Sequence, residues 1–330
     1  MYRFAIVGLG RIARKFAADL RLVEGATLTS VASRSQERAD AFGEEFGARY
    51  AAGSYDELFE GPHLDAVYIA TPHTGHYELV KKCLSHDLPV ICEKPLGMNY
   101  AQVAELVAEA RRRQVYLLEA LWTRFLPTFR EAKRRLADGV IGEITGLRAD
   151  FGFKGVAKDA RRILDLELGG GALLDIGIYP VFLAQEILGA SEVVSAAARF
   201  GDSGADIDET FVLRDERGRH ASLQATFLAE TPTEATVYGT EGVLQWHRKW
   251  FMPSSFTVFP DVGDAVKYKP PKHMGFGYQY EAQSMVEDLR AGRTESELWS
   301  LDDTLRLHRT LTDLREAIGL RYSADAAHPD

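Results

Sequence analysis

The 330-residue sequence lacks the features that mark several classes of protein. It holds only two cysteines, Cys83 and Cys92, which are too few for a disulfide framework or a cysteine-based zinc site. No apolar run approaches the roughly 18 residues that a membrane span needs. A strand pattern begins at Tyr2, so we expect no signal peptide. These absences predict a cytoplasmic protein without a membrane partner.

Positive charge is also scarce relative to negative charge. Asp and Glu number 48 against 39 Lys and Arg, which gives a formal net charge of −9. This balance disfavours binding to the phosphate backbone, so we expect no nucleic-acid partner. The composition, 46% hydrophobic and 26% charged, is ordinary for a globular chain. The length predicts two domains of about 100–200 residues each.

The N-terminal third of the chain alternates between strand and helix patterns. Short apolar runs occur at residues 2–8, 27–32, 65–70, 89–92 and 115–119. Helical periodicity separates them at residues 12–23, 36–46, 76–86 and 100–114. This alternation predicts an α/β fold with a doubly wound parallel sheet and right-handed crossovers. We therefore expect a Rossmann domain over residues 1–122.

Residues 123–330 follow a different pattern. β-Rich segments joined by turn sequences run from residue 143 to 269, and a helix pattern at 171–188 interrupts them early. They predict an α/β domain with a largely antiparallel open sheet. Two helical patterns close the chain, and the final one, 300–320, is a candidate to pack back on the Rossmann domain. An open sheet leaves an uncovered face, so we expect a homodimer formed through it, with the aromatic-rich strand at 246–259 as a candidate contact.

The sequence GLGRIA, residues 8–13, follows the first strand and opens a helix. Gly8 permits a tight turn and Gly10 lets the backbone approach a pyrophosphate, while Ala13 lets helix and strand pack closely. Arg11 and Ile12 begin the helix, whose amide groups bind an anion. In this context the motif predicts a dinucleotide site.

The second strand ends in VASRSQER, where an NAD enzyme tends to carry an acid for the ribose 2′-hydroxyl. Here no acid is present at the strand end. Ser33 offers a hydroxyl, and Arg34 and Arg38 offer cations for a 2′-phosphate. We therefore expect NADP rather than NAD as the cofactor, although a surface arginine is more often simply solvated.

Ligands of an open α/β sheet bind beyond the carboxyl ends of its strands. Polar or aromatic residues follow the apolar runs 65–70, 89–92 and 115–119 at this edge, and we take them as cofactor contacts: Thr71, Pro72, His73, His76, Glu93, Lys94, Trp122 and Arg124. Lys94 is placed to bind a substrate hydroxyl or a ribose. Trp122 and Phe125 either wall the substrate pocket or belong to the core. We expect no metal, because the histidines have no third ligand at short spacing.

The run GGGALLDIGIYPV, residues 169–181, places one carboxylate inside an apolar segment. In a helix, Asp175 and Tyr179 are four residues apart and share one face. The leading glycines are expected to bring the backbone close to substrate or cofactor. The alternatives are a carboxylate near a helix N-terminus and a core phenol with its hydroxyl satisfied.

GLGRIA, VASRS, ATPHTGH, EKPLG and GGGALLDIGIYPV, in this order, resemble the Gfo/Idh/MocA oxidoreductases. EALWTRFLP with Asp175 and Tyr179 is most similar to the branch of dimeric dihydrodiol dehydrogenases and NADP-dependent D-xylose dehydrogenases. The resemblance implies a nicotinamide cofactor and oxidation of a sugar, polyol or cyclic trans-diol. It also implies that Lys94, Asp175 and Tyr179 are catalytic. We expect further pocket contacts from Trp122, Phe125, Phe153, Arg161 and His273.

Two assignments of the proton transfer stay open from the sequence. Tyr179 is our first choice for the acid/base group, with the cation of Lys94 favouring its ionised form. The roles are also exchangeable, with Lys94 taking the proton and Tyr179 orienting the hydroxyl. Asp175 then pairs with Lys94 or orients the substrate.

Two other functions are compatible with this fold. Some relatives hold NAD tightly and cleave glycosides by transient oxidation, but the acid-free strand end and Arg34 argue against NAD. A non-catalytic nucleotide sensor is the other alternative, and the presence of Lys94, Asp175 and Tyr179 argues against it.

Overall fold

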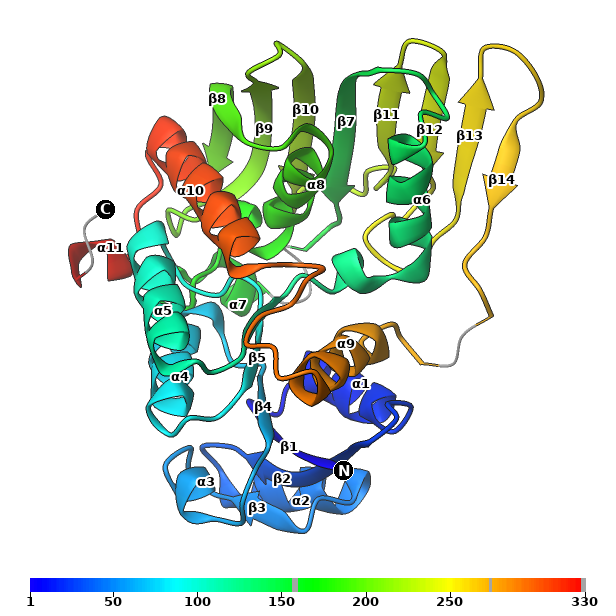
Figure 1. The fold of residues 1–330 in the computed structure, drawn as a ribbon. Helices are drawn as coiled ribbons and strands as arrows, with labels where there is room; N and C mark the ends of the chain where they lie inside the picture. Colours follow the sequence, from blue (N-terminus) through cyan, green and yellow to red (C-terminus); the bar gives the residue numbers. More distant parts are fainter. Residues whose placement is uncertain (156–159, 273–274, 328–330) are drawn as a thin grey trace. The chain divides into compact units, whose positions relative to one another are not determined.

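The computed structural model describes residues 1–155, 160–272 and 275–327, and these form two compact units (Figure 1). The first unit contains residues 1–125 and the described part of 273–305, and the second contains 126–272 and 306 onward. The boundary expected at residue 122 assigned helix α9 (Gln279–Arg290) to the second domain, whereas it groups with the first unit. Helix α10 (Leu301–Ile318) is divided between the units, with Leu301 and Leu305 packed on the core of the first.

The sheet of the first unit is parallel throughout and has the strand order β3-β2-β1-β4-β5-β6. Its strands are β1 (Tyr2–Val7), β2 (Ala26–Ala32), β3 (Tyr50–Ala52), β4 (Ala66–Ile69), β5 (Val90–Glu93) and β6 (Leu117–Ala120). The expected Rossmann fold is confirmed, because the order reverses between β1 and β4 as in doubly wound sheets. The three-residue β3 was not among the predicted strands.

Amphipathic helices connect these strands and bury their apolar faces on the sheet (Figure 1). They are α1 (Arg11–Leu20), α2 (Gln36–Phe46), α3 (Glu57–Glu60), α4 (His76–Ser85) and α5 (Tyr100–Arg113), with the 3-10 turns η1 (His73–Gly75) and η2 (Trp122–Phe125). The strands are almost continuously apolar, as expected for a sheet that is covered on both faces.

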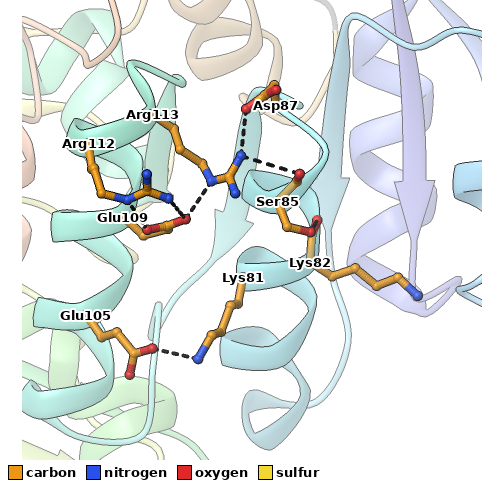
Figure 2. A network of polar contacts seen from close by, with 8 residues as sticks. All are labelled: Lys81, Lys82, Ser85, Asp87, Glu105, Glu109, Arg112 and Arg113. Carbon is orange, nitrogen blue, oxygen red and sulfur yellow. Dashed lines mark hydrogen bonds and ion pairs between the residues drawn. The ribbon is translucent and has the colours of Figure 1, made fainter.

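Charged side chains join the solvent-facing sides of α4 and α5 (Figure 2). The Lys81 ammonium lies 2.6 Å from a Glu105 carboxylate oxygen. Arg113 donates to Glu109 at 2.5 Å and to Asp87 at 2.9 Å. Hydrogen bonds from Arg112 and Arg113 lower the pKa of Glu109 to about 2. Because such pairs near the surface are screened by solvent, they fix the helix register more than they stabilise the fold.

A buried carboxylate explains why α9 groups with the first unit. Asp19, on α1, is 1% exposed and accepts hydrogen bonds from the backbone N–H groups of Phe276, Gly277 and Tyr278 at 2.8–2.9 Å. These amides precede the first turn of α9, so Asp19 acts as a cap supplied from another helix. The φ of Gly275 is +85°, and a Cβ there would lie 2.3 Å from Asp19 Oδ1.

The second unit is built on an eight-stranded sheet of order β14-β13-β12-β11-β7-β10-β9-β8. All neighbours are antiparallel except β7 and β10, which confirms the largely antiparallel prediction. The strands are β7 (Ile144–Gly152), β8 (Ser191–Phe200), β9 (Asp206–Asp215), β10 (His220–Thr226), β11 (Ala235–Gly239), β12 (Gly242–Trp246), β13 (Phe256–Pro260) and β14 (Val266–Tyr268).

Helices α6 (Pro127–Ala137) and α8 (Ile178–Leu188) cover one face of this sheet (Figure 1). The Phe129 ring on α6 lies 5.4 Å from Phe182 on α8 and 5.7 Å from Trp246 on β12, centroid to centroid. Large apolar side chains also remain exposed on the strands: Val194, Phe200, Tyr238, Phe259 and Val266. Within the described residues, α7 (Ala160–Leu164), η3 (Leu166–Leu168), η4 (Leu173–Gly177) and α11 (Ala324–Ala327) complete the unit.

The most apolar 18-residue window of the helical segment Leu166–Leu188 has a mean hydropathy of 1.4, so the segment is long and apolar enough to span a membrane on composition alone. The expectation that no such stretch exists was therefore too strong. However, 78% of its most apolar window is buried inside the protein. That burial is typical of the central helix of a folded unit.

Candidate active site

The loop between β1 and α1 has the geometry of a phosphate-binding turn. The φ of Gly8 is +87°, and a Cβ there would lie 2.7 Å from backbone atoms of Ala70 and Thr71. Gly10 has open space where its Cβ would be, with no heavy atom of the described structure within 4 Å. Helix α1 begins after Gly10 without a capping side chain and without an acid in its first turn. Its N-terminus therefore suits an anion.

A cavity of about 370 Å³ lies beside this loop. Gly10, Arg11, Arg14, Arg38 and Phe42 line it together with Leu9 and Ala41. The expected Arg38 is among these residues and the expected Arg34 is not. Arg14 and Phe42 were missed by the sequence analysis, although each is three or four residues from an expected contact on the same helix. The three guanidinium groups make this a cation-rich cavity next to the phosphate loop.

The end of β2 leads directly into this region. Ser33 is 7% exposed, and its hydroxyl accepts the Ser35 N–H at 3.3 Å. Ser35 in turn caps α2 by accepting the N–H of Arg38. Arg34 is exposed. The local hydrogen bonds thus fix the start of α2, which carries Arg38 at the edge of the cavity.

His76 is completely buried between two turns at the carboxyl edge of the first sheet. Its Nδ1 lies 2.7 Å from the Pro95 carbonyl oxygen and its Nε2 lies 2.9 Å from the Thr71 carbonyl oxygen. Burial lowers the pKa of His76. The hydrogen bonds to the two carbonyl oxygens act in the opposite direction but do not reverse this shift. A neutral imidazole carries one N–H and donates to one carbonyl at a time. These partners differ from the cofactor contact that we expected, and they tie the β4 and β5 turns together.

The remaining residues after β4 are arranged around His76. Thr71 and His73 are nearly buried, at 9% and 7% exposure, while Pro72 is exposed. The His73 and His76 rings are 5.9 Å apart, centroid to centroid. No cluster of three or more His, Cys, Asp or Glu residues that could hold a metal occurs in the part of the chain that the structure describes.

Lys94 is partly buried on the turn after β5, and its neighbours are held by hydrogen bonds. The Tyr68 hydroxyl donates to the Glu93 carboxylate, and the Leu96 N–H donates to Glu119 Oε1 at 2.9 Å. Burial and the charge of Glu93 raise the pKa of Tyr68 well above its usual value. The Lys94–Pro95 peptide bond is cis. Together with His76, these bonds fix the backbone on both sides of Lys94.

The aromatic side chains that follow β6, Trp122 and Phe125, are both buried. Phe125 is 1% exposed, so its ring belongs to the core of the first unit. Trp122 is 5% exposed and stacks on Tyr278 with a centroid separation of 4.5 Å. Arg124 is partly exposed. Of the two alternatives for this segment, the structure favours core packing for Phe125.

The glycine run of the second unit is required by packing within that unit. A Cβ on Gly170 would lie 2.8 Å from backbone atoms of Ile163 and Asp165. The φ of Gly171 is +136°, and a Cβ there would lie 2.1 Å from Asp206 Oδ1 and 2.8 Å from the Tyr322 hydroxyl. These contacts differ from the expected approach to a ligand.

Asp175 lies in the single π-helical turn η4, which leads into α8. Its carboxylate is paired at two points with Arg162, at 3.0 Å from Nη2 and 3.3 Å from Nη1. Its side chain is 12% exposed. Single π-turns are frequent at functional sites. Arg162 was a candidate pocket residue, but its pairing with Asp175 was not predicted, because Arg162 lies on the separate helix α7.

Tyr179, in the first turn of α8, is 7% exposed. Its ring centroid lies 5.0 Å from that of Phe251 and 5.7 Å from that of Phe151. The expected Phe153 follows β7 and packs edge-on against Phe227. The sequence analysis missed Phe151 and Phe251. Of the other expected pocket residues, the side chain of Arg161 and all of His273 lie outside the described residues.

Comparison with known proteins decides the family. A model described as an oxidoreductase family with an NAD-binding Rossmann fold matches residues 2–120, and the GFO/IDH/MocA C-terminal domain matches residues 129–245. The chain belongs to the Gfo/Idh/MocA family. The resemblance is thereby confirmed, as is the prediction of a nicotinamide-dependent dehydrogenase.

Relatives within the family cover nearly the whole chain. Trans-1,2-dihydrobenzene-1,2-diol dehydrogenases of Mus musculus and Homo sapiens are 35% and 34% identical, and each alignment covers 98% of both proteins. The 3-ketoreductase KijD10 of Actinomadura kijaniata, solved with NADP and TDP-benzene, is 28% identical with a TM-score of 0.87, over 96% of this chain and 98% of that one. An aldose-aldose oxidoreductase of Caulobacter crescentus shares the fold at a TM-score of 0.86 and 22% identity, over 96% of this chain and 97% of that one.

Proposed function

We propose that this protein is an NADP-dependent dehydrogenase that transfers hydride between nicotinamide and a secondary alcohol of a sugar, polyol or cyclic trans-diol. The observation that carries the proposal is the position of Lys94. It follows β5 at the carboxyl edge of the Rossmann sheet, where ligands of such sheets bind, and its backbone is fixed on both sides. The name of the near full-length dihydrodiol dehydrogenases supports a diol as substrate, and the name of the 3-ketoreductase supports hydride transfer to a ketone.

The residues beside the phosphate loop fit NADP. Gly10 and the uncapped N-terminus of α1 would hold the pyrophosphate. Ser33 and Arg38 would hold the adenosine ribose and its 2′-phosphate, with Arg11 and Arg14 adding positive charge. When bound, the nicotinamide accepts or donates the hydride.

The protein's own groups manage the hydroxyl proton. Lys94, in the first unit, would bind the substrate hydroxyl. Tyr179, in the second unit, is the acid/base group that we propose for the hydroxyl proton. The rings of Phe151 and Phe251 limit the access of water to the Tyr179 phenol. Asp175 acts through its two-point pair with Arg162. This pair fixes the helical turn that precedes Tyr179.

A substrate panel tests the proposal directly. Aldoses, polyols and cyclic trans-diols are offered with NADP and NAD in parallel, and the absorbance of the reduced cofactor is followed. We expect reduction of NADP with at least one member of the panel and weaker reduction of NAD. Glycoside cleavage without net reduction would instead indicate the tightly held NAD mechanism, and no reaction at all would contradict the dehydrogenase.

The cofactor preference is expected to depend on Arg38 more than on Arg34. A hydrogen bond to a charged group contributes roughly 1.5–3 kcal/mol, so Arg38→Ala should raise the KM for NADP about 10- to 100-fold and leave that for NAD unchanged. Arg34→Ala is the matched control, because both arginines are exposed but only Arg38 is among the residues lining the cavity. A larger loss from Arg34→Ala, or an equal rise of both KM values, would contradict this assignment.

We also propose a cytoplasmic homodimer formed through the open sheet of the second unit. The exposed apolar side chains on β8, β11, β13 and β14 support this contact. Both cysteines are free and buried, which agrees with a reducing compartment. Light scattering at micromolar concentration should give twice the monomer mass, and Phe259→Glu should reduce it. A monomeric mass for the unaltered protein would contradict the dimer.

A further inference from the structure

Two acidic side chains are buried beneath the glycine run of the second unit. Asp206 and Glu209, both on β9, are 0% and 1% exposed. Both side chains are buried on the same strand, and Asp206 is among the causes that raise the pKa of Glu209. Asp206 Oδ2 accepts the Leu173 N–H at 2.6 Å. Asp206 Oδ1 and both Glu209 oxygens have no hydrogen-bond donor among the residues that the structure describes.

A β-bulge brings the two carboxyl groups together. Arg199 on β8 pairs with Asp208, but the next residue, Phe200, pairs with Asp206, which leaves Ile207 without a partner on β8. In a regular strand, residues three apart point to opposite faces. The extra residue in the bulge reverses this, so Asp206 and Glu209 both face the core. The regular pairing of β9 with β8 is therefore interrupted next to Asp206, on the strand that also carries Glu209.

Two adjacent carboxylates that are removed from water do not both ionise near neutral pH, because desolvation and mutual repulsion oppose the second charge. Burial and the charge of Asp206 raise the pKa of Glu209 well above its usual range. Asp208 on the same strand adds repulsion in the same direction.

The other charged groups near the pair come from the C-terminal segment. Burial raises the pKa of Tyr322. The phenol also interacts electrostatically with Asp206, Glu209, Arg315 and Asp325. The cation of Arg315 is paired with Asp325 and lies over the Tyr322 ring at 4.8 Å from its centroid.

We propose that Asp206 and Glu209 share one proton, and that the resulting singly charged pair positions the segment that carries Asp175 and Tyr179. Asp206 holds the Leu173 N–H, two residues before Asp175. The Tyr322 hydroxyl donates to the Gly170 carbonyl oxygen at 2.9 Å. Gly171, between them, contacts Asp206 closely enough to exclude a Cβ. One negative charge at the beginning of this helical segment is also favoured by its dipole.

The shared proton makes the segment sensitive to alkaline pH. Folding raises the pKa of Glu209 above its value in the unfolded chain. The stabilisation from the protonated carboxyl is therefore complete below the unfolded-state pKa. It is lost as the pH rises from there toward the pKa of the folded protein. Loss of the proton would place two negative charges under Gly171 and Leu173. The effect of this shared proton on catalysis rests on the proposed function. The existence of the shared proton does not depend on that function.

Glu209→Gln tests the proton directly, because the amide keeps the shape of the side chain and supplies an N–H to Asp206. Glu216→Gln, on the exposed turn of the same hairpin, is the matched control. We expect the infrared band of a protonated carboxyl at neutral pH to lose intensity in Glu209→Gln and to stay unchanged in Glu216→Gln. Unchanged intensity in Glu209→Gln would overturn the shared proton.

The positioning role has separate readouts. The loss of unfolding free energy between neutral and alkaline pH should be smaller in Glu209→Gln than in the unaltered protein. Glu209→Ala should lower kcat about 10- to 100-fold, with the KM for NADP unchanged, and Glu209→Gln should restore it. Equal kcat in all variants would overturn the positioning role. If no substrate of the panel reacts with any variant, the proposed function fails, while the infrared result still decides the proton.

Discussion

Replacing Lys94 by alanine is expected to lower kcat/KM about 100- to 10,000-fold without unfolding the protein. Removal of a group that acts on the transferred proton has an effect of this size. The hydrogen bonds of Tyr68, His76 and Glu119 to neighbouring residues hold the turn, so its backbone should keep its position. The measurements are steady-state kinetics with the best substrate of the panel and a thermal melting curve.

Two further variants show whether Lys94 acts together with Tyr179. Tyr179→Phe removes only the hydroxyl, and its loss should be of similar size. If both residues serve the same hydroxyl, the double variant should lose little more than the worse single variant. Lys81→Ala is the matched control, since Lys81 pairs with Glu105 on the outer side of α4 and α5 (Figure 2). Unaltered kcat/KM in Lys94→Ala would contradict the proposed mechanism.

Gly171→Ala is expected to give one of the largest losses of stability in the second unit. A non-glycine residue in so rare a backbone conformation costs roughly 1–3 kcal/mol. The added Cβ would also lie 2.1 Å from Asp206 Oδ1, which has to move although it is buried. The midpoint of urea or thermal unfolding measures the loss.

Gly189→Ala separates the two contributions. Its φ is +82°, but no heavy atom of the described structure lies within 4 Å of its Cβ position. It should therefore show only the backbone effect, and the difference from Gly171→Ala reports the contact with Asp206. Equal losses from the two variants would mean that Asp206 moves aside without consequence.

Local patterns in the sequence predicted most of the Rossmann unit. Each strand with a clear apolar run was found, whereas β3, with three residues, is too short to show a period. The place of α9 could not be predicted in the same way. Its periodicity indicates a helix, but its position depends on Asp19, more than 250 residues earlier in the chain.

In the candidate site, too, features set by the local sequence could be predicted, whereas contacts between distant residues could not. Lys94 follows a strand, and the position of a strand end can be predicted from sequence. The two-point partner of Asp175 and the carbonyl partners of His76 come from other elements, which no spacing indicates. The glycine run was expected to approach a ligand, but the bulge that sets Asp206 against Gly171 depends on pairing between β8 and β9.

The bond between Asp19 and the start of α9 has a consequence for synthesis on the ribosome. Asp19 lacks its amide partners, and the first unit lacks helix α9, until residues 276–290 have emerged, about 150 residues after Phe125. At about 5–20 residues per second, this delay lasts roughly 7–30 s. The second unit similarly waits for Tyr322 to reach Gly170. Both units therefore gain part of their hydrogen bonding only after the C-terminal part of the chain has been made.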